Sequence, residues 1–372
     1  MNVLYDSQIF LQQRYGGISR YFCAIALRSI NESGINARIC APTNSNLYLE
    51  QIPATIKFEP NFSALKNYYI RRACNLLSEE YFHMAFSPDI IHETHYSKKP
   101  RCKTKSKRVL TVYDMIQERL PEFFSTSEPT SNNKMVAASR ADHIIFISKA
   151  TQSDFLEMSD YPVERTSVIH LGFELQEMLS TPTEALIKEQ LTSAPYILYV
   201  GKRSGYKNFS ALAAAVAQSQ VLRDFQLVCF GGGGFTTDEL SVLSRVGLGG
   251  SRAMQIQGSD ALLAKFYRGA ACFVYPSLYE GFGIPPLEAM ACDCPVACSN
   301  TSSIPEVVGD AGLYFDPTST DDIRIAIEKI VSSPSVTEQL IERGRNRLKM
   351  FSWDRCASET FALYHRIHKE AH

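Results

Sequence analysis

Short runs of β-branched and aromatic residues alternate with longer helical patterns along this chain, and the alternation begins a second time near residue 196. The strands predicted in the first series are Val3–Tyr5, Ala37–Ala41, Ile90–His92, Val109–Val112, His143–Ile147 and Thr166–His170. Those predicted in the second series are Tyr196–Val200, Gln226–Phe230, Ala253–Gln257, Cys272–Tyr275, Pro295–Cys298 and Leu313–Phe315. Because helical stretches such as Ile18–Ile30 and Met135–Ala141 lie between the strands, the pattern predicts parallel sheets covered by helices on both faces.

The two series predict two domains. A chain of 372 residues is too long for one ordinary hydrophobic core, so we expect two doubly wound, Rossmann-like α/β domains that face each other across a cleft. The polar segment Glu174–Pro195 is the predicted connection, which gives a first domain of residues 1–175 and a second of 176–353. A final helix is predicted from about Arg355 to His368, capped by Ser352 or Asp354.

Charge and hydropathy exclude several classes of protein. The formal net charge is −1, so no overall field favours nucleic acid as a partner. No apolar run reaches about 18 residues, and no transmembrane helix is expected. The segment Met1–Asp6 lacks a basic region and carries an acid early, so it predicts a first strand rather than a signal peptide.

The ten cysteines are scattered, and several lie in apolar runs, where cysteine behaves as a small hydrophobe. A reducing cytosol is the simplest context for such a pattern. Cys292, Cys294 and Cys298 are close in sequence, but a zinc site would need a fourth ligand and tighter pairing. We therefore expect core packing and no metal.

The segment from Glu280 to Met290 is the most informative local motif, since it joins a predicted strand to a predicted helix. Pro286 suits the first position of that helix, and the preceding glycines let the backbone approach a ligand. Backbone N–H groups and the positive dipole end at this turn favour a phosphate, and Glu288 can accept the hydroxyls of a ribose. The alternative is that Glu288 only stabilises the helix dipole and that Glu280 is a solvated loop residue.

A basic segment, Gly201–Asn208, follows the predicted strand Tyr196–Val200. Ligands gather beyond the carboxyl ends of strands in open parallel sheets. Lys202, Arg203 and Lys207 can there neutralise a departing diphosphate. The alternative is a surface loop with ordinary basic residues.

Four consecutive glycines, Gly231–Gly234, follow the strand Gln226–Phe230. They do not complete a dinucleotide fingerprint, because Thr236 stands where the third glycine would be needed. The sequence also contains no Gly-Lys-Ser/Thr, so a Walker loop is excluded. We expect a tight turn here, and an NAD-dependent oxidoreductase is disfavoured.

The first half of the chain carries further candidates for ligand contact. Gly16 and Gly17 allow the loop before the first helix to approach a ligand. His92 ends one predicted strand, and Tyr113 and Asp114 follow another. A histidine at a strand end is more often a hydrogen-bonded structural residue than a base, and the same caution applies to Tyr113 and Asp114.

A basic run also lies in the first half, made up of Lys98, Lys99, Arg101, Lys103, Lys105, Lys107 and Arg108. A solvated loop between two strands is one interpretation. The other is a patch that contacts an anionic membrane surface or an anionic lipid-linked acceptor.

Taken together, these motifs resemble the family-four retaining glycosyltransferases of the GT-B fold, and the resemblance extends over nearly the whole chain. It rests on the Gly16-Gly17 loop, Thr111–Asp114, Ala141–Ser148, Gly201–Asn208 and above all Tyr275–Met290. The two glutamates separated by seven residues, Glu280 and Glu288, with their surroundings are its most specific part.

The resemblance implies a role for each matching residue. Glu288 would hold the ribose hydroxyls, Glu280 would contact the sugar ring, and Arg203 and Lys207 would hold the diphosphate. Backbone amides of Gly281, Phe282, Gly283 and Ile284 would meet phosphate and sugar. The acceptor would bind the first domain, and the C-terminal helix, residues 354–372, would cross back onto it. The reaction would retain the anomeric configuration without a metal or another cofactor.

Two positions depart from the family pattern. Lys202 stands where many members have arginine, so either Lys202 or Arg203 could touch the diphosphate. Tyr113 stands where many members have a histidine close to the transferred sugar, and Tyr113 or His92 could replace its hydrogen bond.

The sequence therefore predicts a cytoplasmic hexosyltransferase, with possible peripheral contact with the inner face of the plasma membrane. The segment Tyr5–Phe10 resembles that of bacterial surface-polysaccharide mannosyltransferases, including those of lipopolysaccharide O-antigen synthesis. This implies transfer of mannose from GDP-mannose to a lipid-linked or polysaccharide acceptor. The alternatives are a UDP-sugar donor and a catalytically silent GT-B subunit that only binds sugar.

Overall fold

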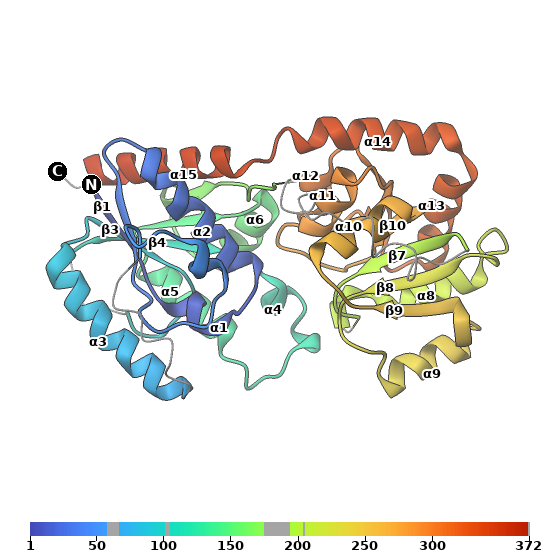
Figure 1. The fold of residues 1–372 in the computed structure, drawn as a ribbon, viewed down its shortest axis with the longest axis horizontal. Helices are drawn as coiled ribbons and strands as arrows, with labels where there is room; N and C mark the ends of the chain where they lie inside the picture. Colours follow the sequence, from blue (N-terminus) through green and yellow to red (C-terminus); the bar gives the residue numbers. More distant parts are fainter. Residues whose placement is uncertain (58–66, 101–104, 175–193, 204, 371–372) are drawn as a thin grey trace. The chain divides into compact units, whose positions relative to one another are not determined.

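The computed structural model describes residues 1–57, 67–100, 105–174, 194–203 and 205–370 (Figure 1). The chain divides into two compact units. Unit 1 comprises Met1–Gly172 together with Ser352–His372, and unit 2 comprises Phe173–Phe351. Most of the predicted connection, Glu174–Pro195, lies outside the described residues.

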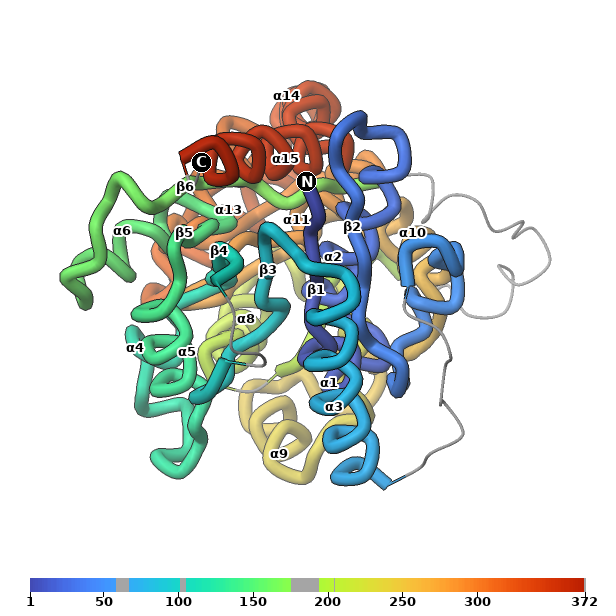
Figure 2. The backbone as a smooth tube through the Cα atoms, turned by 90° about the vertical axis from the view of Figure 1, so that its left-hand side faces the viewer, coloured from blue at the N-terminus to red at the C-terminus, as the bar shows by residue number. Residues whose placement is uncertain are grey.

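Unit 1 is built on a parallel sheet with the strand order β2-β1-β3-β4-β5-β6, which can be followed across Figure 2. Its strands are β1 (Asn2–Tyr5), β2 (Asn36–Ile39), β3 (Ile90–Glu93), β4 (Lys107–Val112), β5 (His143–Phe146) and β6 (Thr166–Val168). Its helices are α1 (Gln8–Gln12), α2 (Gly17–Arg28), α3 (Tyr68–Phe86), α4 (Ile116–Arg119), α5 (Thr130–Ser139), α6 (Lys149–Glu157) and α15 (Trp353–Glu370).

Unit 2 has a second parallel sheet, in the order β12-β11-β10-β7-β8-β9. Its strands are β7 (Tyr196–Val200), β8 (Gln226–Phe230), β9 (Ala253–Ile256), β10 (Cys272–Tyr275), β11 (Val296–Ser299) and β12 (Gly312–Phe315). Its helices are α8 (Phe209–Gln218), α9 (Thr237–Arg245), α10 (Asp260–Gly269), α11 (Ile284–Ala291), α12 (Ile304–Val308), α13 (Thr320–Ser332) and α14 (Pro334–Leu348).

The predicted fold class is confirmed, since both units are Rossmann-like and every predicted strand is present. The strands are fully buried in the middle of each sheet because helices cover both faces. In unit 2, for example, Ile197, Cys229 and Val274 are not exposed at all and pack with side chains of α8 and α13.

The C-terminal helix belongs to unit 1, where α15 packs against α2 (Figure 1). Its cap is Ser352, whose Oγ accepts a hydrogen bond of 3.1 Å from the backbone N–H of Arg355. Asp354, the other predicted cap, lies inside the helix and pairs with Arg28 at 2.5 Å. The prediction that α11 begins at Pro286 was wrong, because the helix begins at Ile284. The N-cap residue is Gly283. Its φ of +115° is a backbone conformation that glycine adopts readily and that is costly for residues with a side chain.

None of the helices that the structure describes combines the length and the apolar character needed to cross a bilayer.

His92 supports the interior of unit 1. It is completely buried, and its ring nitrogens lie 2.6 Å from the Tyr364 hydroxyl of α15 and 2.8 Å from the Thr111 hydroxyl of β4. The suggestion that His92 contacts the transferred sugar is therefore corrected: both ring nitrogens already have partners, and no edge of the ring reaches the surface.

This burial predicts a loss of stability in acid. Burial lowers the pKa of His92 to about 3, whereas an unfolded histidine titrates near 6.5. Below that value His92 is protonated in the unfolded chain but stays neutral in the native state, so protonation favours unfolding. We expect the free energy of unfolding to fall by about 1 kcal/mol for each pH unit between roughly pH 6 and 4, as measured by chemical denaturation.

The His92→Gln variant should flatten this pH dependence, because glutamine can replace the hydrogen bonds without titrating. The slope should decrease without vanishing, since burial also lowers the pKa of His143 to about 4. His365→Gln, on the same helix as Tyr364, is the matched control and should keep the slope of the parent protein. An unchanged slope in His92→Gln would contradict the argument.

Candidate functional site

The candidate site of unit 2 lies at the point where its strand order reverses. In the order β12-β11-β10-β7-β8-β9, β7 and β10 are neighbours. The strand that follows β7 in sequence, β8, lies on one side of this pair, and the strand that follows β10, β11, lies on the other side. The carboxyl ends of such a strand pair form the usual ligand crevice of an open parallel sheet. The Gly201–Asn208 segment follows β7, and the Glu280 turn follows β10.

Lys207 and Glu280 meet at this place although they are far apart in the sequence. The Nζ atom of Lys207 donates a hydrogen bond of 2.6 Å to Oε1 of Glu280. The side chains are 23% and 9% exposed, so the pair is partly screened and yet open to a ligand. Lys207 also lies over the rings of Tyr206 and Tyr275, at 5.1 and 5.9 Å from their centroids. The result is a positioned cation beside an oriented carboxylate.

Two serines that the sequence analysis did not single out hold the turn after Glu280. The hydroxyl of Ser303 lies 2.8 Å from the carbonyl oxygen of Glu280 and 2.9 Å from that of Phe282. The hydroxyl of Ser302 accepts a hydrogen bond of 2.9 Å from the backbone N–H of Glu280. Serine after a strand is an ordinary loop residue, so only the tertiary contact assigns them this role.

The start of α11 offers fewer backbone donors than a helix normally does. Pro285 and Pro286 occupy its second and third positions, and proline has no backbone N–H. Among the first three positions of α11, Ile284 is therefore the residue that keeps a backbone N–H.

Glu288 extends from α11 and is held by a buried tyrosine. The hydroxyl of Tyr267, on α10, donates to Oε2 of Glu288 at 3.1 Å and lies 3.3 Å from the carbonyl oxygen of Pro285. Tyr267 is completely buried, and burial raises the pKa of its phenol, so it stays a donor. Sequence reasoning missed Tyr267 because it lies on an apolar helix face and is typical of core packing.

Arg203 does not join Lys207. Its guanidinium instead donates to the carbonyl oxygens of Gly231, Gly233 and Gly234 at 2.9, 2.8 and 3.0 Å and to Glu239 at 3.1 Å. The side chain is 1% exposed. The predicted direct contact between Arg203 and a diphosphate is therefore corrected, because the donors of the guanidinium are already directed at protein acceptors.

This contact explains the four glycines. Gly231, Gly232 and Gly233 have φ values of +81°, +71° and +78°, which curl their carbonyl groups around Arg203. A Cβ atom on Gly232 would lie 2.6 Å from the carbonyl oxygen of Gly201 and 2.9 Å from Nη1 of Arg203. The tight turn formed by Gly231–Gly234 is thus a binding site for the guanidinium of Arg203, and we call it the glycine socket.

Lys202 behaves differently from its neighbour Arg203. Its side chain is exposed, while its carbonyl oxygen accepts a hydrogen bond from the hydroxyl of Tyr199 on β7. The backbone is therefore anchored and the amino group is left accessible, which suits a contact with a bound anion.

Unit 1 holds the other predicted residues. Gly16 precedes α2, and a Cβ there would lie 2.2 Å from Oε1 of Gln13, whereas Gly17 has open space around it. Tyr113 is buried at the end of β4. Asp114 is half-exposed, and the buried amino group of Lys134 donates to its carbonyl oxygen at 2.7 Å. These residues surround the carboxyl end of the first sheet.

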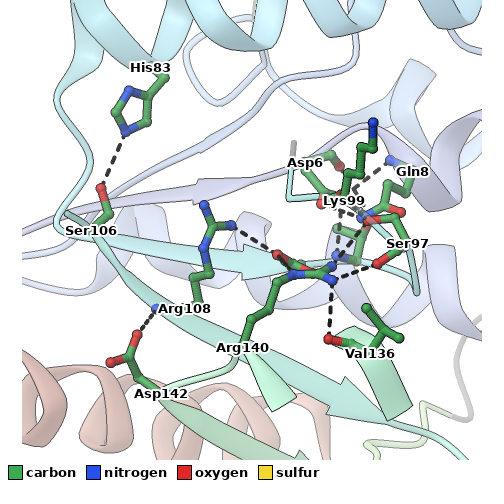
Figure 3. A network of polar contacts seen from close by, with 12 residues as sticks. Asp6, Gln8, His83, Ser97, Lys99, Ser106, Arg108, Val136, Arg140 and Asp142 are labelled. Atoms are coloured by element: carbon green, nitrogen blue, oxygen red, sulfur yellow. Dashed lines mark hydrogen bonds and ion pairs between the residues drawn. The ribbon is translucent and has the colours of Figure 1, made fainter. Parts of the chain in front are cut away.

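Two described members of the basic run between β3 and β4 are paired with acidic residues of the fold. Arg108 is buried and pairs with Glu93 at 2.9 Å, and Lys107 pairs with Asp142 at 3.1 Å. Figure 3 shows Arg108 within a polar network that also includes Arg140. Lys98, Lys99 and Lys105 are exposed, while Arg101 and Lys103 lie outside the described residues.

Among the described residues, no group of three or more His, Cys, Asp or Glu side chains is placed to hold a metal ion. Cys292, Cys294 and Cys298 are buried, and burial raises the pKa of the Cys292 thiol to about 11. They pack as small hydrophobic residues.

Comparison with known proteins yields two family matches that together cover most of the chain. Residues 15–177 match the model "Glycosyltransferase Family 4", and residues 183–347 match "Glycosyl transferases group 1". The chain is 34% identical over 265 residues to O-antigen chain mannosyltransferase B of Escherichia coli, with 69% of each chain covered. It is 29% identical over 235 residues to the MMP alpha-(1->4)-mannosyltransferase of Mycolicibacterium hassiacum, with 62% of this chain and 55% of the relative covered.

Solved structures with this fold include the sucrose-phosphate synthase of Thermosynechococcus elongatus, with a TM-score of 0.71, 20% identity and 99% of both chains covered. HepE of Anabaena, in complex with UDP and glucose, aligns with a TM-score of 0.70 at 18% identity over 98% of both chains. WaaG, a glycosyltransferase involved in lipopolysaccharide biosynthesis, aligns with a TM-score of 0.66 at 16% identity, covering 97% of this chain and 98% of that one. These likenesses establish the architecture of the fold.

Proposed function

Since this chain belongs to the family 4 glycosyltransferases of the GT-B fold, we propose that it transfers mannose from GDP-mannose to a lipid-linked or polysaccharide acceptor, with retention of the anomeric configuration. Mannose is favoured because the two curated relatives described above are named mannosyltransferases. An acceptor in surface-glycan synthesis is favoured because one of them is named an O-antigen chain mannosyltransferase. A catalytically silent subunit is not carried forward, because the chain is a glycosyltransferase.

The observation that carries this proposal is the Lys207–Glu280 pair at the switch point of unit 2. In the reaction, the bond between C1 of the sugar and the β-phosphate oxygen breaks, and a bond from the acceptor oxygen to C1 forms. Negative charge therefore develops on the departing diphosphate. Lys207 is a fixed cation at the carboxyl edge of the sheet, and preorganised charge of this kind stabilises a leaving group strongly.

The other groups of the site take complementary roles in the proposal. Glu288, steadied by Tyr267, accepts hydrogen bonds from the ribose hydroxyls. The amides of Gly281 to Ile284 meet the phosphate and sugar oxygens, and Glu280 orients both Lys207 and the sugar hydroxyls. Lys202 takes the second cation position that the resemblance left open, because Arg203 is committed to the glycine socket.

Acceptor binding is proposed for unit 1, at the residues that surround the carboxyl end of its sheet: Gly16, Gly17, Tyr113 and Asp114. No metal is required in this scheme, because Lys202 and Lys207 supply the positive charge. A cytoplasmic location with peripheral contact to the plasma membrane remains part of the proposal.

Titration calorimetry with GDP, UDP and ADP, each alone, tests the donor. We expect GDP to bind most tightly and GDP-mannose to compete with it. Tighter binding of UDP would transfer the proposal to a UDP-sugar, the ligand type present in the HepE complexes. If none of the three nucleotides binds, the donor site itself is wrong. The anomeric configuration of the product, read by NMR, tests retention.

The Glu288→Gln variant examines the ribose contact within the same experiment. Hydrogen bonds to a charged acceptor are worth about 1.5–3 kcal/mol, so the variant should bind GDP roughly tenfold more weakly with little change in kcat. Glu338→Gln, an exposed position on α14, is the matched control. Equal affinity in the two variants would exclude Glu288 from the ribose site.

A further inference from the structure

A lysine is buried in unit 1 next to the residues at which the acceptor is proposed to bind. Lys134 lies on α5 and is 1% exposed, and the other buried residues of this helix are Ala137 and Ala138. Taking an ammonium group out of water costs free energy, and ion pairs inside a protein offset this cost only in part. Because a well-packed apolar residue often serves stability equally well, stability alone does not explain a lysine at this position.

The amino group of Lys134 holds the turn that follows β4. Its Nζ atom donates hydrogen bonds of 2.7 Å to the backbone carbonyl oxygen of Asp114 and 2.8 Å to Oε2 of Glu118. It also lies 3.7 Å from Oδ1 of Asp114. Lys134 therefore contacts both the backbone and the carboxylate of Asp114, and a cation from a different helix sets the position of this residue.

Tyr96 holds the residue that precedes Asp114. Its hydroxyl accepts a hydrogen bond of 3.1 Å from the backbone N–H of Tyr113. The ring of Tyr96 has the Nζ atom of Lys134 at 5.7 Å from its centroid, a distance at which a cation and an aromatic ring attract each other. Together, Lys134 and Tyr96 fix the N–H of Tyr113 and the carbonyl group of Asp114, which are the two ends of one dipeptide.

These contacts leave part of the Asp114 carboxylate accessible. Oδ1 accepts a hydrogen bond of 3.2 Å from the backbone N–H of Ile116, and the side chain is 37% exposed. In the described part of the chain, Oδ2 has no hydrogen-bond partner. A carboxylate accepts hydrogen bonds and donates none, so a ligand that carries hydroxyl groups is a matching partner.

Space for such a ligand lies beside Tyr96. Tyr96 and Asn133, the residue before Lys134, line a hollow of about 790 Å³ together with Gln8 and Gln12 of α1. Amide side chains both donate and accept hydrogen bonds, as sugar hydroxyls require. Oδ1 of Asn133 has no hydrogen-bond partner among the described residues. This part of the lining therefore offers polar groups of the kind that bind sugar rings.

We propose that Lys134 is a positioning residue of the acceptor site. It holds the Asp114 peptide so that the carboxylate accepts a hydrogen bond from a hydroxyl group of the acceptor sugar. Lys134 itself does not touch the acceptor and acts through Asp114. A displacement of about 1 Å in a group that orients a substrate can cost about a hundredfold in rate, which is why the hold on Asp114 matters. This inference rests on the proposed function, which places acceptor binding at Tyr113 and Asp114.

The Lys134→Met variant tests this role on the full chain, with GDP-mannose as donor and octyl α-mannoside as acceptor. Methionine has a side chain of similar length without the amino group, so kcat/KM for octyl mannoside should fall about a hundredfold. The affinity for GDP, measured by calorimetry, should stay unchanged because the proposed donor residues belong to unit 2. Lys134→Arg should recover part of the loss, since a guanidinium can still donate to the carbonyl oxygen of Asp114.

A double variant decides whether Lys134 acts through Asp114. Asp114→Asn alone keeps an Oδ1 acceptor for Ile116 but removes the charge, so kcat/KM for octyl mannoside should fall about tenfold to a hundredfold. Residues that act as one unit are not additive. Lys134→Met combined with Asp114→Asn should therefore lose no more than the more impaired single variant. A lysine with a purely structural role would instead give losses that multiply.

Arg119→Gln is the matched control. Arg119 belongs to α4 in the same turn but pairs with Asp154 of α6, at 2.5 Å. Ion pairs that are partly exposed contribute little to stability. The variant should therefore loosen α4 slightly without moving Asp114, and kcat/KM for octyl mannoside should stay within about twofold of the parent value.

Three kinetic results would overturn the inference: unchanged kcat/KM in Lys134→Met, losses that multiply in the double variant, and an equal loss in Arg119→Gln. Saturation-transfer NMR with octyl mannoside alone needs no donor and separates this inference from the proposed function. A protein that binds GDP but not the mannoside would exclude the acceptor contact and leave the donor site in place. Mannoside binding that Lys134→Met weakens, in a protein that binds no nucleotide, would support the inference and contradict the proposed donor.

Discussion

Replacing Lys207 by alanine is expected to lower kcat about a hundredfold to a thousandfold, the loss that follows removal of one preorganised charge contact to a transition state. The amino group lies 2.6 Å from Glu280, in a short turn that follows β7, and in the proposed reaction it faces the charge that develops on the leaving diphosphate. Initial rates of donor turnover at saturating nucleotide sugar measure the effect. Donor KM should change less than kcat, because the charge develops mainly in the transition state.

The Lys207→Arg variant separates charge from geometry. Arginine keeps the positive charge but presents a planar fork rather than a compact ammonium, so activity should return only in part. Lys329→Ala, a substitution in α13 of the same unit, is the control for loss of a lysine and should leave kcat unchanged. Full activity of Lys207→Ala would remove this residue from the reaction, and with it the proposed role of the pair.

The Arg203→Ala variant should lower the free energy of unfolding by about 3–5 kcal/mol, the cost of removing one partner from a buried charge pair. The substitution would leave Glu239 without its cation and would remove the Arg203 donor from the carbonyl groups of Gly233 and Gly234. Arg203→Lys should recover only part of the stability, because one ammonium cannot span the socket. Chemical denaturation measures both.

Lys202 provides the complementary variant. Its side chain is exposed, so Lys202→Ala should leave the free energy of unfolding nearly unchanged and should slow turnover. We therefore expect Arg203→Ala to lower mainly the free energy of unfolding, and Lys202→Ala to lower mainly the turnover rate. If Arg203→Ala is as stable as the parent and inactive, the guanidinium contacts the diphosphate after all.

The strands were predictable because their signal is local. A buried parallel strand needs several consecutive apolar residues, and runs such as Tyr196–Val200 and Cys272–Tyr275 carry this requirement in the sequence. The start of α11 was missed by two residues, because the φ of +115° at Gly283 that caps the helix is a property of the folded turn and not of the residue type alone.

The candidate site was predictable only in part. The glutamates, glycines and cations around the two loops follow strand ends, and a strand end in a parallel sheet is a place for ligands. The partners of these residues were not predictable. Tyr267 is one of many apolar residues in α10, and its hydroxyl contact with Glu288 follows from how α10 packs beside α11.

The sequence by itself determined two Rossmann-like units and the motifs of a family 4 glycosyltransferase, because hydrophobic periodicity and loop composition are local properties of a chain. Only the tertiary structure decided which charges meet. Lys202 and Arg203 are neighbours in sequence, but the side chain of Lys202 is exposed and that of Arg203 is buried. Lys207 and Glu280 are far apart in sequence and become partners because β7 pairs with β10. The same holds for α3, in which Asn75 and Glu79 are buried while Leu77 and Met84 are exposed. The charge and hydropathy of each residue follow from the sequence, but the direction of its side chain depends on how the helices and strands around it pack.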